Sequence, residues 1–323
     1  MEIIQYIQKN TFQIGCILVG LFLVYYFIYL YPKPKAIKRV QPIKVIKIDF
    51  VDFWTISTKP DNYFLRLLRR YTNHRFIIDE NNPDISFVNI PIHTTQLKES
   101  KVIGFIGEPQ FKPNPNYHLN FTFDQTKNNN IRYPLWLLFG NNEIHPDKNL
   151  QLYESPKSKF CCWVASNCHN NSTTHNGYRL DFVKELSTYK TVDCGGSCLN
   201  NIGYKVDDKI KFQKDYKFCV AFENTKQRGY TTEKILHAYK SNCIPIYFGN
   251  DMVKQDFNPE TFINAHDFNS TQELIDYIIR VDTDEQLYKS YFGKPIYSQY
   301  WLDIFNDPEE RYFKNICKRI LKD

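Results

Sequence analysis

Three patterns are missing from this sequence, and two of the absences narrow its functional class. There is no dense cluster of Lys and Arg, so the formal net charge of +6 does not indicate nucleic-acid binding. A charge of this size suits an anionic nucleotide or a membrane surface instead. No two cysteines have Cys-x2-Cys spacing and no histidine lies near them at ligand spacing, which argues against zinc. There is also no internal repeat, and 323 residues are enough for two domains.

An uncharged apolar stretch occupies residues 14–31. As a helix it would be about 27 Å long, close to the thickness of the bilayer core, so we predict a membrane span. No small-residue cleavage site follows, and Pro32 ends the stretch, which favours an uncleaved signal anchor. The charges after the span outnumber Lys9 before it, so the positive-inside rule places the remainder of the chain in the cytosol. The charges after the span are Lys33, Lys35, Lys38 and Arg39.

The cysteines beyond the span are even in number, as disulfides in an oxidising compartment would require. Cys194 and Cys198 flank two glycines and form the favoured local pair, although spacing alone does not fix the connectivity. Cys219 and Cys243 lie next to apolar runs and are predicted to be core residues. Sequons for N-glycosylation begin at Asn120, Asn170, Asn171 and Asn269.

Strand and helix patterns alternate after the linker, which predicts a doubly wound α/β domain. Residues 44–50 alternate like a strand, residues 63–68 read as a helix, and residues 85–90 and 101–106 read as further strands. Glu108 follows the last of these between Gly107 and Pro109. That position suits a general base, but it also suits an ordinary surface carboxylate.

Residues 218–249 read as one βαβ unit. The apolar runs 218–222 and 244–248 are typical of strands buried in a parallel sheet, and Ile235 to Tyr239 have helical spacing. Thr231 and Thr232 are predicted to cap this helix, which places Glu233 and Lys234 in its first turn. A phosphate would bind well at such a helix N-terminus.

Four segments carry a family resemblance: Phe222-Glu223-Asn224-Thr225, Gly229-Tyr230, Thr232-Glu233-Lys234-Ile235 and Ile244-Pro245-Ile246-Tyr247. They resemble the donor-binding signature of the α-1,3-fucosyltransferases, glycosyltransferase family ten. The resemblance covers roughly residues 45–300 and is thin from 51 to 100. It implies two Rossmann-like doubly wound domains facing a cleft (GT-B type), preceded by one N-terminal transmembrane helix.

The predicted organisation combines this resemblance with the patterns above. It comprises a short N-terminal tail (1–13), a transmembrane signal anchor (14–31), a Pro/Lys linker (32–43), an acceptor-side α/β domain (44–157), a nucleotide-sugar donor-binding α/β domain (158–295) and a C-terminal helical tail (296–323).

The resemblance also assigns site residues. Glu108 matches the general base of the family, and Arg179, at the start of a helix predicted over 178–189, matches an arginine that contacts the donor pyrophosphate. A solvated arginine on the helix face is the alternative for Arg179. Lys234 would bind the pyrophosphate as well. Asn224, Tyr230 and Glu233 are implied as donor contacts.

The implied reaction is transfer of L-fucose from GDP-β-L-fucose, with inversion, to a hydroxyl of a GlcNAc-containing glycan in protein glycosylation. It forms an α-1,3 linkage, with α-1,4 as an alternative. The scheme requires no metal cofactor, and a divalent metal such as Mn²⁺ would at most stimulate it. Asp282-Thr283-Asp284 has the form of a metal-binding motif but is interpreted as a solvated helix start.

Two alternatives remain open: the same fold with another sugar nucleotide, and an inactive glycan-binding membrane protein. The family also implies a single-pass type II protein of the Golgi membrane with a lumenal catalytic domain. That orientation is opposite to the one indicated by the flanking charges, and we favour the orientation of the family.

Overall fold

The computed structural model describes residues 42–53, 61–90, 99–109, 111–123, 127–139, 153, 154, 156–166 and 176–322, together with Ile3 and Leu21. The chain divides into two compact units, Met1–Pro42 and Ile43–Asp323, and both β-sheets belong to the second. The predicted membrane span lies outside the described residues apart from Leu21. Among the residues that are described, none belongs to a helix both long and apolar enough to cross a bilayer.

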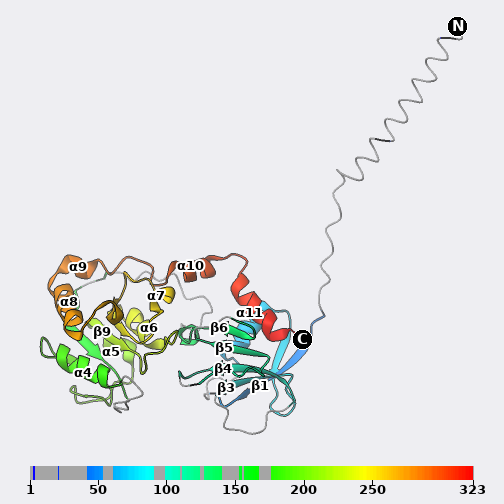
Figure 1. Ribbon diagram of the computed structural model, residues 1–323, viewed down its shortest axis with the longest axis horizontal. Coiled ribbons are helices and arrows are strands. Elements are labelled where there is room, and N and C mark those ends of the chain that lie inside the picture. The colour runs from blue at the N-terminus through cyan, green and yellow to red at the C-terminus, as the bar shows by residue number, and fades with distance from the viewer. Residues whose placement is uncertain are drawn as a thin grey trace. The chain divides into compact units, whose positions relative to one another are not determined.

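The first sheet is parallel throughout and has the strand order β2-β1-β3-β4-β5-β6. Its strands are β1 (Val45–Val51), β2 (Arg75–Ile78), β3 (Ile85–Ile90), β4 (Lys101–Ile106), β5 (Leu119–Thr122) and β6 (Asn130–Arg132). Strands β1, β3, β4, β5 and β6 are labelled in Figure 1. Helices α2 (Tyr63–Tyr71) and α3 (Trp136–Phe139) accompany the sheet. The predicted strands and helix of this region are confirmed, whereas β2, β5 and β6 were not predicted.

The second sheet is also parallel and has the order β11-β10-β9-β7-β8. Its strands are β7 (Lys159–Trp163), β8 (Val192–Cys194), β9 (Tyr216–Phe222), β10 (Ile244–Phe248) and β11 (Ile263–Asn264). Its helices are α4 (Asn176–Leu186), α5 (Lys209–Gln213), α6 (Glu233–Lys240), α7 (Val253–Asp256), the 3-10 helix η3 (Ala265–Asp267), α8 (Thr271–Thr283) and α9 (Glu285–Lys289). The predicted βαβ unit is confirmed as β9, α6 and β10.

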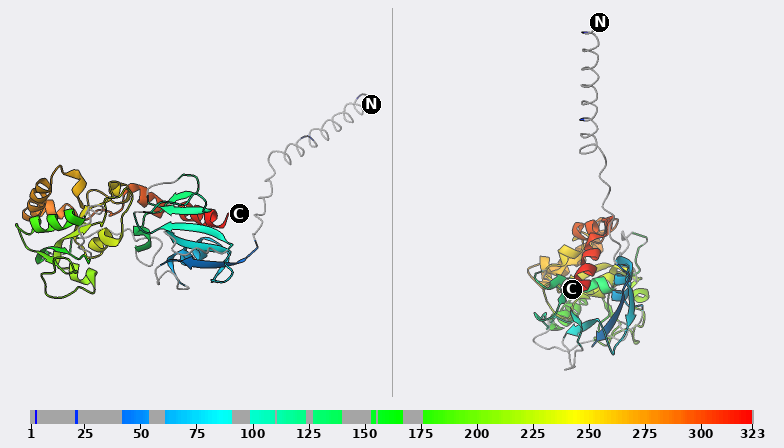
Figure 2. Two further views of the ribbon diagram at one scale, coloured as in Figure 1. Left: turned by 60° about the horizontal axis from the view of Figure 1, so that its bottom comes forward. Right: turned by 90° about the vertical axis from the view of Figure 1, so that its right-hand side faces the viewer.

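The C-terminal segment returns to the first sheet. It forms α10 (Gln299–Asn306) and α11 (Arg311–Leu321), and α11 packs against α2. Figure 2 shows α11, at the red end of the chain, beside the strands of the first sheet. Arg319 donates to the carbonyl of Asn128, and Lys101 donates to the carbonyls of Leu321 and Lys322, so the end of α11 is tied to the loop before β6 and to the start of β4.

A buried ion pair joins β6 to α7. The Nη2 of Arg132 donates to both carboxylate oxygens of Asp256, at 2.8 and 2.9 Å, and the indole Nε1 of Trp301 donates to Asp256 Oδ1 at 2.8 Å. Asp256 is completely buried. Trp136 packs edge-on against Trp301, so the junction between the two sheets combines a charge pair with an aromatic core.

Two predictions from the sequence need correction. Cys198 is disulfide-bonded but Cys194 is a free thiol, so the predicted Cys194–Cys198 pair is wrong. The interpretation of the metal-like motif as a solvated helix start holds for Asp284, which is exposed and caps α9, but it is wrong for Asp282, which lies in the last turn of α8 and is buried between Lys190 and Lys217.

One of the sequons is buried. Asn120 lies within β5, completely buried, and its side chain bonds to the backbone of Asn114. The sequon there is inaccessible in the folded protein. Those at Asn170 and Asn171 lie outside the described residues, and Asn269 is exposed.

Candidate functional site

The strand order of the second sheet marks the place where a ligand would bind. The order reverses between β7 and β9, and ligands of open α/β sheets bind at such a switch point, beyond the carboxyl ends of the strands. A pocket of about 250 Å³ lies there, and its lining includes Trp163 to Ser166 after β7 as well as Phe222 and Asn224 at the end of β9. The fold itself therefore selects this pocket as the candidate site.

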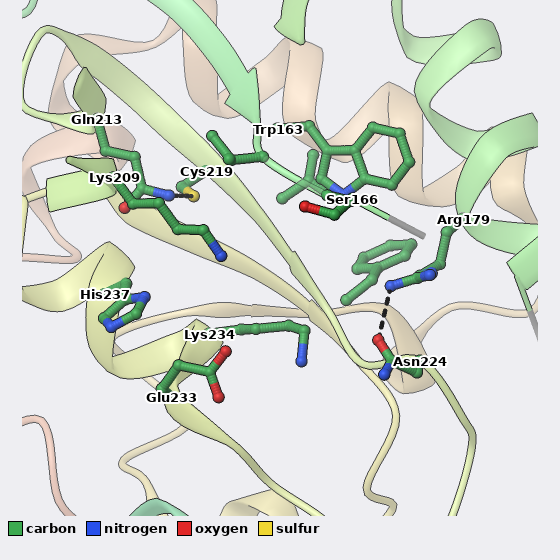
Figure 3. A pocket seen from close by; sticks show the side chains of 14 residues that line it. Trp163, Ser166, Arg179, Lys209, Gln213, Cys219, Asn224, Glu233, Lys234 and His237 are labelled. Carbon is green, nitrogen blue, oxygen red and sulfur yellow. Dashed lines mark hydrogen bonds between the residues drawn. The ribbon is translucent and has the colours of Figure 1, made fainter. Parts of the chain in front are cut away.

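The pocket has a pronounced positive character. Its charged, imidazole and amide side chains come from α4, α5, α6 and the loop after β9: Arg179, Lys209, Gln213, Asn224, Glu233, Lys234 and His237. Figure 3 shows Arg179 and Asn224 on one side of the pocket and Lys209 and His237 on the other, with Lys234 between them. An anionic ligand fits this arrangement.

Arg179 is held deep in the site. It is only 2% exposed, and its Nη1 donates to Asn224 Oδ1 at 3.1 Å. Burial lowers the pKa of its guanidinium from the ordinary value, while Glu223 opposes this effect. The alternative of a solvated helix-face arginine is therefore wrong, and the structure brings Arg179 to the same pocket as Asn224 and Lys234.

Helix α6 supplies the centre of the pocket because of how its faces are divided. Ile235, Leu236, Ala238 and Tyr239 are buried in the core, which turns Glu233, Lys234 and His237 towards the pocket. Glu233 and His237 are four residues apart and so lie on one face. The first-turn N–H groups of a helix lack intrahelical partners and attract anions.

The cap of α6 differs from the prediction. Thr232 occupies the N-cap position but its side chain makes no capping bond. Its hydroxyl and its backbone N–H both bond to the carboxylate of Glu223 instead. Glu223 also accepts a hydrogen bond from Lys234 Nζ at 2.8 Å.

Both ionisable side chains in the first turn of α6, Glu233 and Lys234, have pKa values shifted towards their charged forms. Burial alone lowers the pKa of Lys234, but Glu223 and Glu233 outweigh this and raise it above the ordinary value. Burial alone raises the pKa of Glu233, but Lys234, its own backbone N–H, His237 and Lys209 lower it overall. An ammonium and a carboxylate therefore stand side by side where the helix begins.

Two of the predicted residues lie outside the pocket lining. Tyr230 is 3% exposed and packs against Phe123, with ring centroids 5.2 Å apart, so the structure assigns it to the core. Glu108 is exposed in the loop after β4. Partial burial of its carboxyl raises its pKa, an effect that Lys234 opposes and Glu233 and Glu223 increase. These electrostatic interactions place Glu108 near the first turn of α6.

The structure also adds residues that the sequence did not single out. Lys209 and His237 line the pocket, and Glu223 lies beneath it, fully buried. His237 had a signal in the sequence, since it follows Glu233 by four positions on a predicted helix. Lys209 had none, because α5 is short and its place beside α6 depends on tertiary packing. Across the described residues, no group of His, Cys, Asp and Glu is arranged to hold a metal ion.

Comparison with known proteins now decides the family. The model of "Glycosyltransferase family 10 (fucosyltransferase) C-term" matches residues 154–322, which include every residue that lines the pocket. The chain belongs to glycosyltransferase family 10. Within this family it is 44% identical over 132 residues to the alpha-(1,3)-fucosyltransferase FucT of Helicobacter pylori, which covers 41% of this chain and 26% of that protein.

A second relative is the mouse 4-galactosyl-N-acetylglucosaminide 3-alpha-L-fucosyltransferase 9, which is 30% identical over 179 residues, 54% of this chain and 46% of that protein. This family 10 chain thus matches between about a quarter and a half of the length of these curated relatives. A crystal structure of an alpha1,3-fucosyltransferase with GDP-fucose has a TM-score of 0.66 and 27% identity, and the match covers 88% of this chain and 92% of that one.

Proposed function

We propose that this chain is an inverting α-1,3-fucosyltransferase that moves L-fucose from GDP-β-L-fucose to a hydroxyl of a GlcNAc-containing glycan. The observation that carries the proposal is the cationic pocket at the switch point of the second sheet, where Arg179 and Lys234 meet the start of α6. Family membership and the solved relative with GDP-fucose support the same donor.

The donor side would stabilise the leaving group. As the bond between fucose C1 and the β-phosphate oxygen breaks, the electron pair stays on GDP and negative charge grows on the diphosphate. Arg179 can bind it through a planar fork, Lys234 as a point charge, and the N-terminus of α6 through its N–H groups. Such preorganised charge is effective in a partly desolvated site. Asn224 and Glu233 remain proposed donor contacts, whereas Tyr230 would act through packing.

Glu108 would act as the general base. It takes the proton of the acceptor hydroxyl while the acceptor oxygen bonds to fucose C1 on the face opposite the leaving diphosphate, which inverts the configuration. The raised pKa of Glu108 suits this role, because a base is most effective when its pKa approaches the working pH. No step of this scheme needs a metal ion.

The acceptor is proposed from chemistry and relatives together. The name of the mouse relative specifies a galactosyl-N-acetylglucosaminide as its acceptor, and the name of the Helicobacter relative specifies an α-(1,3) linkage. We therefore expect a GlcNAc-containing acceptor and an α-1,3 product, with α-1,4 transfer as the alternative to test.

The deciding experiment measures transfer from labelled GDP-fucose to a panel of glycans by the full-length chain in detergent. GDP binding is measured in parallel, and GDP-mannose and UDP-galactose serve as competing donors. Transfer of fucose supports the proposal. Transfer from another donor would indicate a different sugar nucleotide, GDP binding without transfer to any glycan would indicate an inactive member of the family, and no GDP binding would contradict the proposal.

We also propose that residues 14–31 anchor the chain in the Golgi membrane with the catalytic unit in the lumen. Asn269 provides the test, because its sequon is exposed whereas that of Asn120 is buried. A lumenal chain should lose mass with an N-glycosidase, and Asn269→Gln should remove part of that loss. A chain that carries no N-glycan and is digested by protease added to sealed microsomes would instead have the orientation that its flanking charges indicate.

A further inference from the structure

Glu223 stands out because a fully buried carboxylate rarely occurs without partners. Its Oε1 accepts the backbone N–H of Thr232 at 2.7 Å, and the Thr232 hydroxyl lies 3.0 and 2.9 Å from its two oxygens. Its Oε2 accepts from Lys234 Nζ at 2.8 Å. The carboxylate thus bonds to the residue before α6 and to the second residue of the helix.

The backbone of the neighbouring strand makes room for this side chain. Gly249 follows β10 with a φ of +146°, and a Cβ at this position would lie 2.6 Å from Glu223 Cβ and 2.7 Å from Glu223 Cγ. Any larger residue would push the carboxylate out of place. Glu223 can therefore occupy this position only because residue 249 is a glycine.

Asn250 fixes the loop between β9 and α6 from the same side. Its Oδ1 accepts the backbone N–H of Gly229 at 2.6 Å, and its Nδ2 donates to Thr231 Oγ1 at 2.9 Å. Together with Glu223, these bonds hold residues 229–232 from below. The start of α6 is therefore positioned by a buried polar network rather than by a side-chain cap of its own.

The ammonium of Lys234 fits between this network and the pocket. It donates to Glu223 Oε2 and to Thr232 Oγ1, the latter at 2.9 Å. An ammonium has three N–H donors, so one remains for a ligand in the pocket that Lys234 lines. A lysine side chain is otherwise flexible, and fixing it before the ligand arrives lowers the entropic cost of binding.

We propose that Glu223 is a positioning residue for donor binding, which holds the Lys234 ammonium and the first turn of α6 in the geometry that receives a diphosphate. This inference rests on the proposed function, because it takes Lys234 as a ligand of the diphosphate. Glu223 itself stays beneath the pocket and does not touch the donor.

The pH dependence of binding reports on this role. The titratable groups that face Lys234 come from four elements: Glu223, Glu233, His237, Arg179 and Glu108. Burial lowers the pKa of Lys234, while Glu223 and Glu233 raise it overall. Loss of the Glu223 charge should therefore lower this pKa, and GDP binding should weaken at a lower pH than in the wild type.

The test measures GDP binding by calorimetry from pH 6 to about 11.5, a range that extends above the ordinary pKa of lysine, with the full-length chain in detergent. We expect Glu223→Gln to weaken binding about tenfold, the effect of losing a hydrogen bond between charged groups, and to shift the alkaline loss of binding by roughly one pH unit towards neutrality. Glu260→Gln is the matched control, because Glu260 is an exposed carboxylate paired with Lys294. It should leave both quantities unchanged.

A second pair of variants covers the case in which Glu223→Gln does not fold. Thr232→Val keeps the shape of the side chain and removes its hydroxyl, whereas Thr232→Ser keeps the hydroxyl. If positioning depends on the hydrogen bonds, the valine variant should lose several-fold in GDP affinity and the serine variant should bind like the wild type. A purely steric role of Thr232 would give the opposite order.

A double-mutant comparison separates this inference from the proposed function. Glu223→Gln should cause a smaller loss of affinity in a Lys234→Met background than in the wild type, since the contact of Lys234 with GDP is already absent there and only the hold on the first turn of α6 can still be weakened. If Glu223→Gln lowers only the melting temperature and leaves GDP binding and its pH profile unchanged, Glu223 is structural and the inference is wrong. A wild-type chain that does not bind GDP would overturn the proposed function and this inference with it.

Discussion

Glu223 and Glu108 occupy similar places in the two sheets but have opposite environments. Glu223 directly follows β9 and is completely buried, whereas Glu108 lies two residues beyond β4 and is exposed. The buried carboxylate bonds to Thr232 and Lys234 and does not line the pocket. The exposed one is open to solvent. Under the proposed mechanism, we infer that the second sheet supplies fixed charge and the first sheet supplies the proton acceptor.

The largest effect should come from removing that proton acceptor. We expect Glu108→Gln to lower kcat by roughly 10²–10⁴-fold, the usual contribution of general-base catalysis, while GDP affinity stays at the wild-type value. Glu99→Gln is the control, because Glu99 is an exposed carboxylate just before the same strand. Steady-state kinetics and calorimetry measure the two quantities. Equal losses of kcat and GDP affinity would place Glu108 on the donor side and break the comparison.

The second largest effect should be a loss of stability when the ion pair between Arg132 and Asp256, at the junction of the two sheets, is broken. Burial raises the pKa of Asp256, although Arg132 and Trp301 oppose this, so Arg132→Met would leave a poorly compensated buried carboxylate. We expect a loss of about 3–5 kcal/mol in the free energy of unfolding. Because a raised pKa favours the protonated form, the loss should be larger at pH 8 than at pH 5. Urea denaturation at both pH values measures it.

A partly exposed ion pair provides the control for this prediction. Lys47 and Asp79 lie 3.0 Å apart on the first sheet with side chains 35% and 25% exposed. Lys47→Met should cost at most about 1 kcal/mol, because solvent screens such pairs. Similar costs for Arg132→Met and Lys47→Met would show that the junction does not depend on its buried charge.

The sequence was most informative where local signals agreed. The apolar runs around residues 218–222 and 244–248 and the helical spacing between them predicted β9, α6 and β10, and Arg179, Asn224, Glu233 and Lys234 do meet in one pocket. Pairing across long sequence distances was not predictable. No local pattern shows that Lys209 lies beside α6, or that Glu223 displaces a Thr232 cap.

The errors have physical causes as well. Asp282 was interpreted as solvated because charged residues surround it in the sequence, but two of its partners, Lys190 and Lys217, come from distant segments and allow it to be buried. The pairing of Cys194 with Cys198 followed from proximity alone. In the structure Cys194 belongs to β8 and its thiol remains free.

A smaller loss of stability and of GDP affinity should follow from adding a side chain next to the pocket, at Gly196. An ideal Cβ on Gly196 would lie 2.0 Å from the carbonyl oxygen of Ala165, a backbone atom of a residue that lines the pocket. We expect Gly196→Ala to cost about 1–3 kcal/mol in stability and to weaken GDP binding, because the end of β7 must move.

Gly203→Ala is the matched comparison. Gly203 has a φ of +80° and open space around it, so alanine there should cost about 1 kcal/mol through backbone strain without affecting GDP affinity. Thermal melts and calorimetry separate the two variants. If both bind GDP equally well, the carboxyl end of β7 tolerates movement and the donor side is less rigid than we infer.

The smallest predicted effect is a shift in the pH dependence of kcat, caused by the charge of Glu233 acting on Glu108. Partial burial raises the pKa of Glu108, Lys234 lowers it, and Glu233 raises it further. Glu233→Gln should therefore lower the pKa of Glu108, and since the base must be deprotonated, the acid limb of kcat should move to lower pH by roughly half a unit.

That shift should be measured at saturating GDP-fucose, so that weaker donor binding does not obscure it. Glu285→Gln is the control, because Glu285 is exposed and pairs with Lys289 four residues later. An acid limb that moves upward in Glu233→Gln would show that Glu233 acts on Glu108 through structure rather than through its charge. An unchanged acid limb would show that the charge of Glu233 on the second sheet does not influence the pKa of Glu108 on the first.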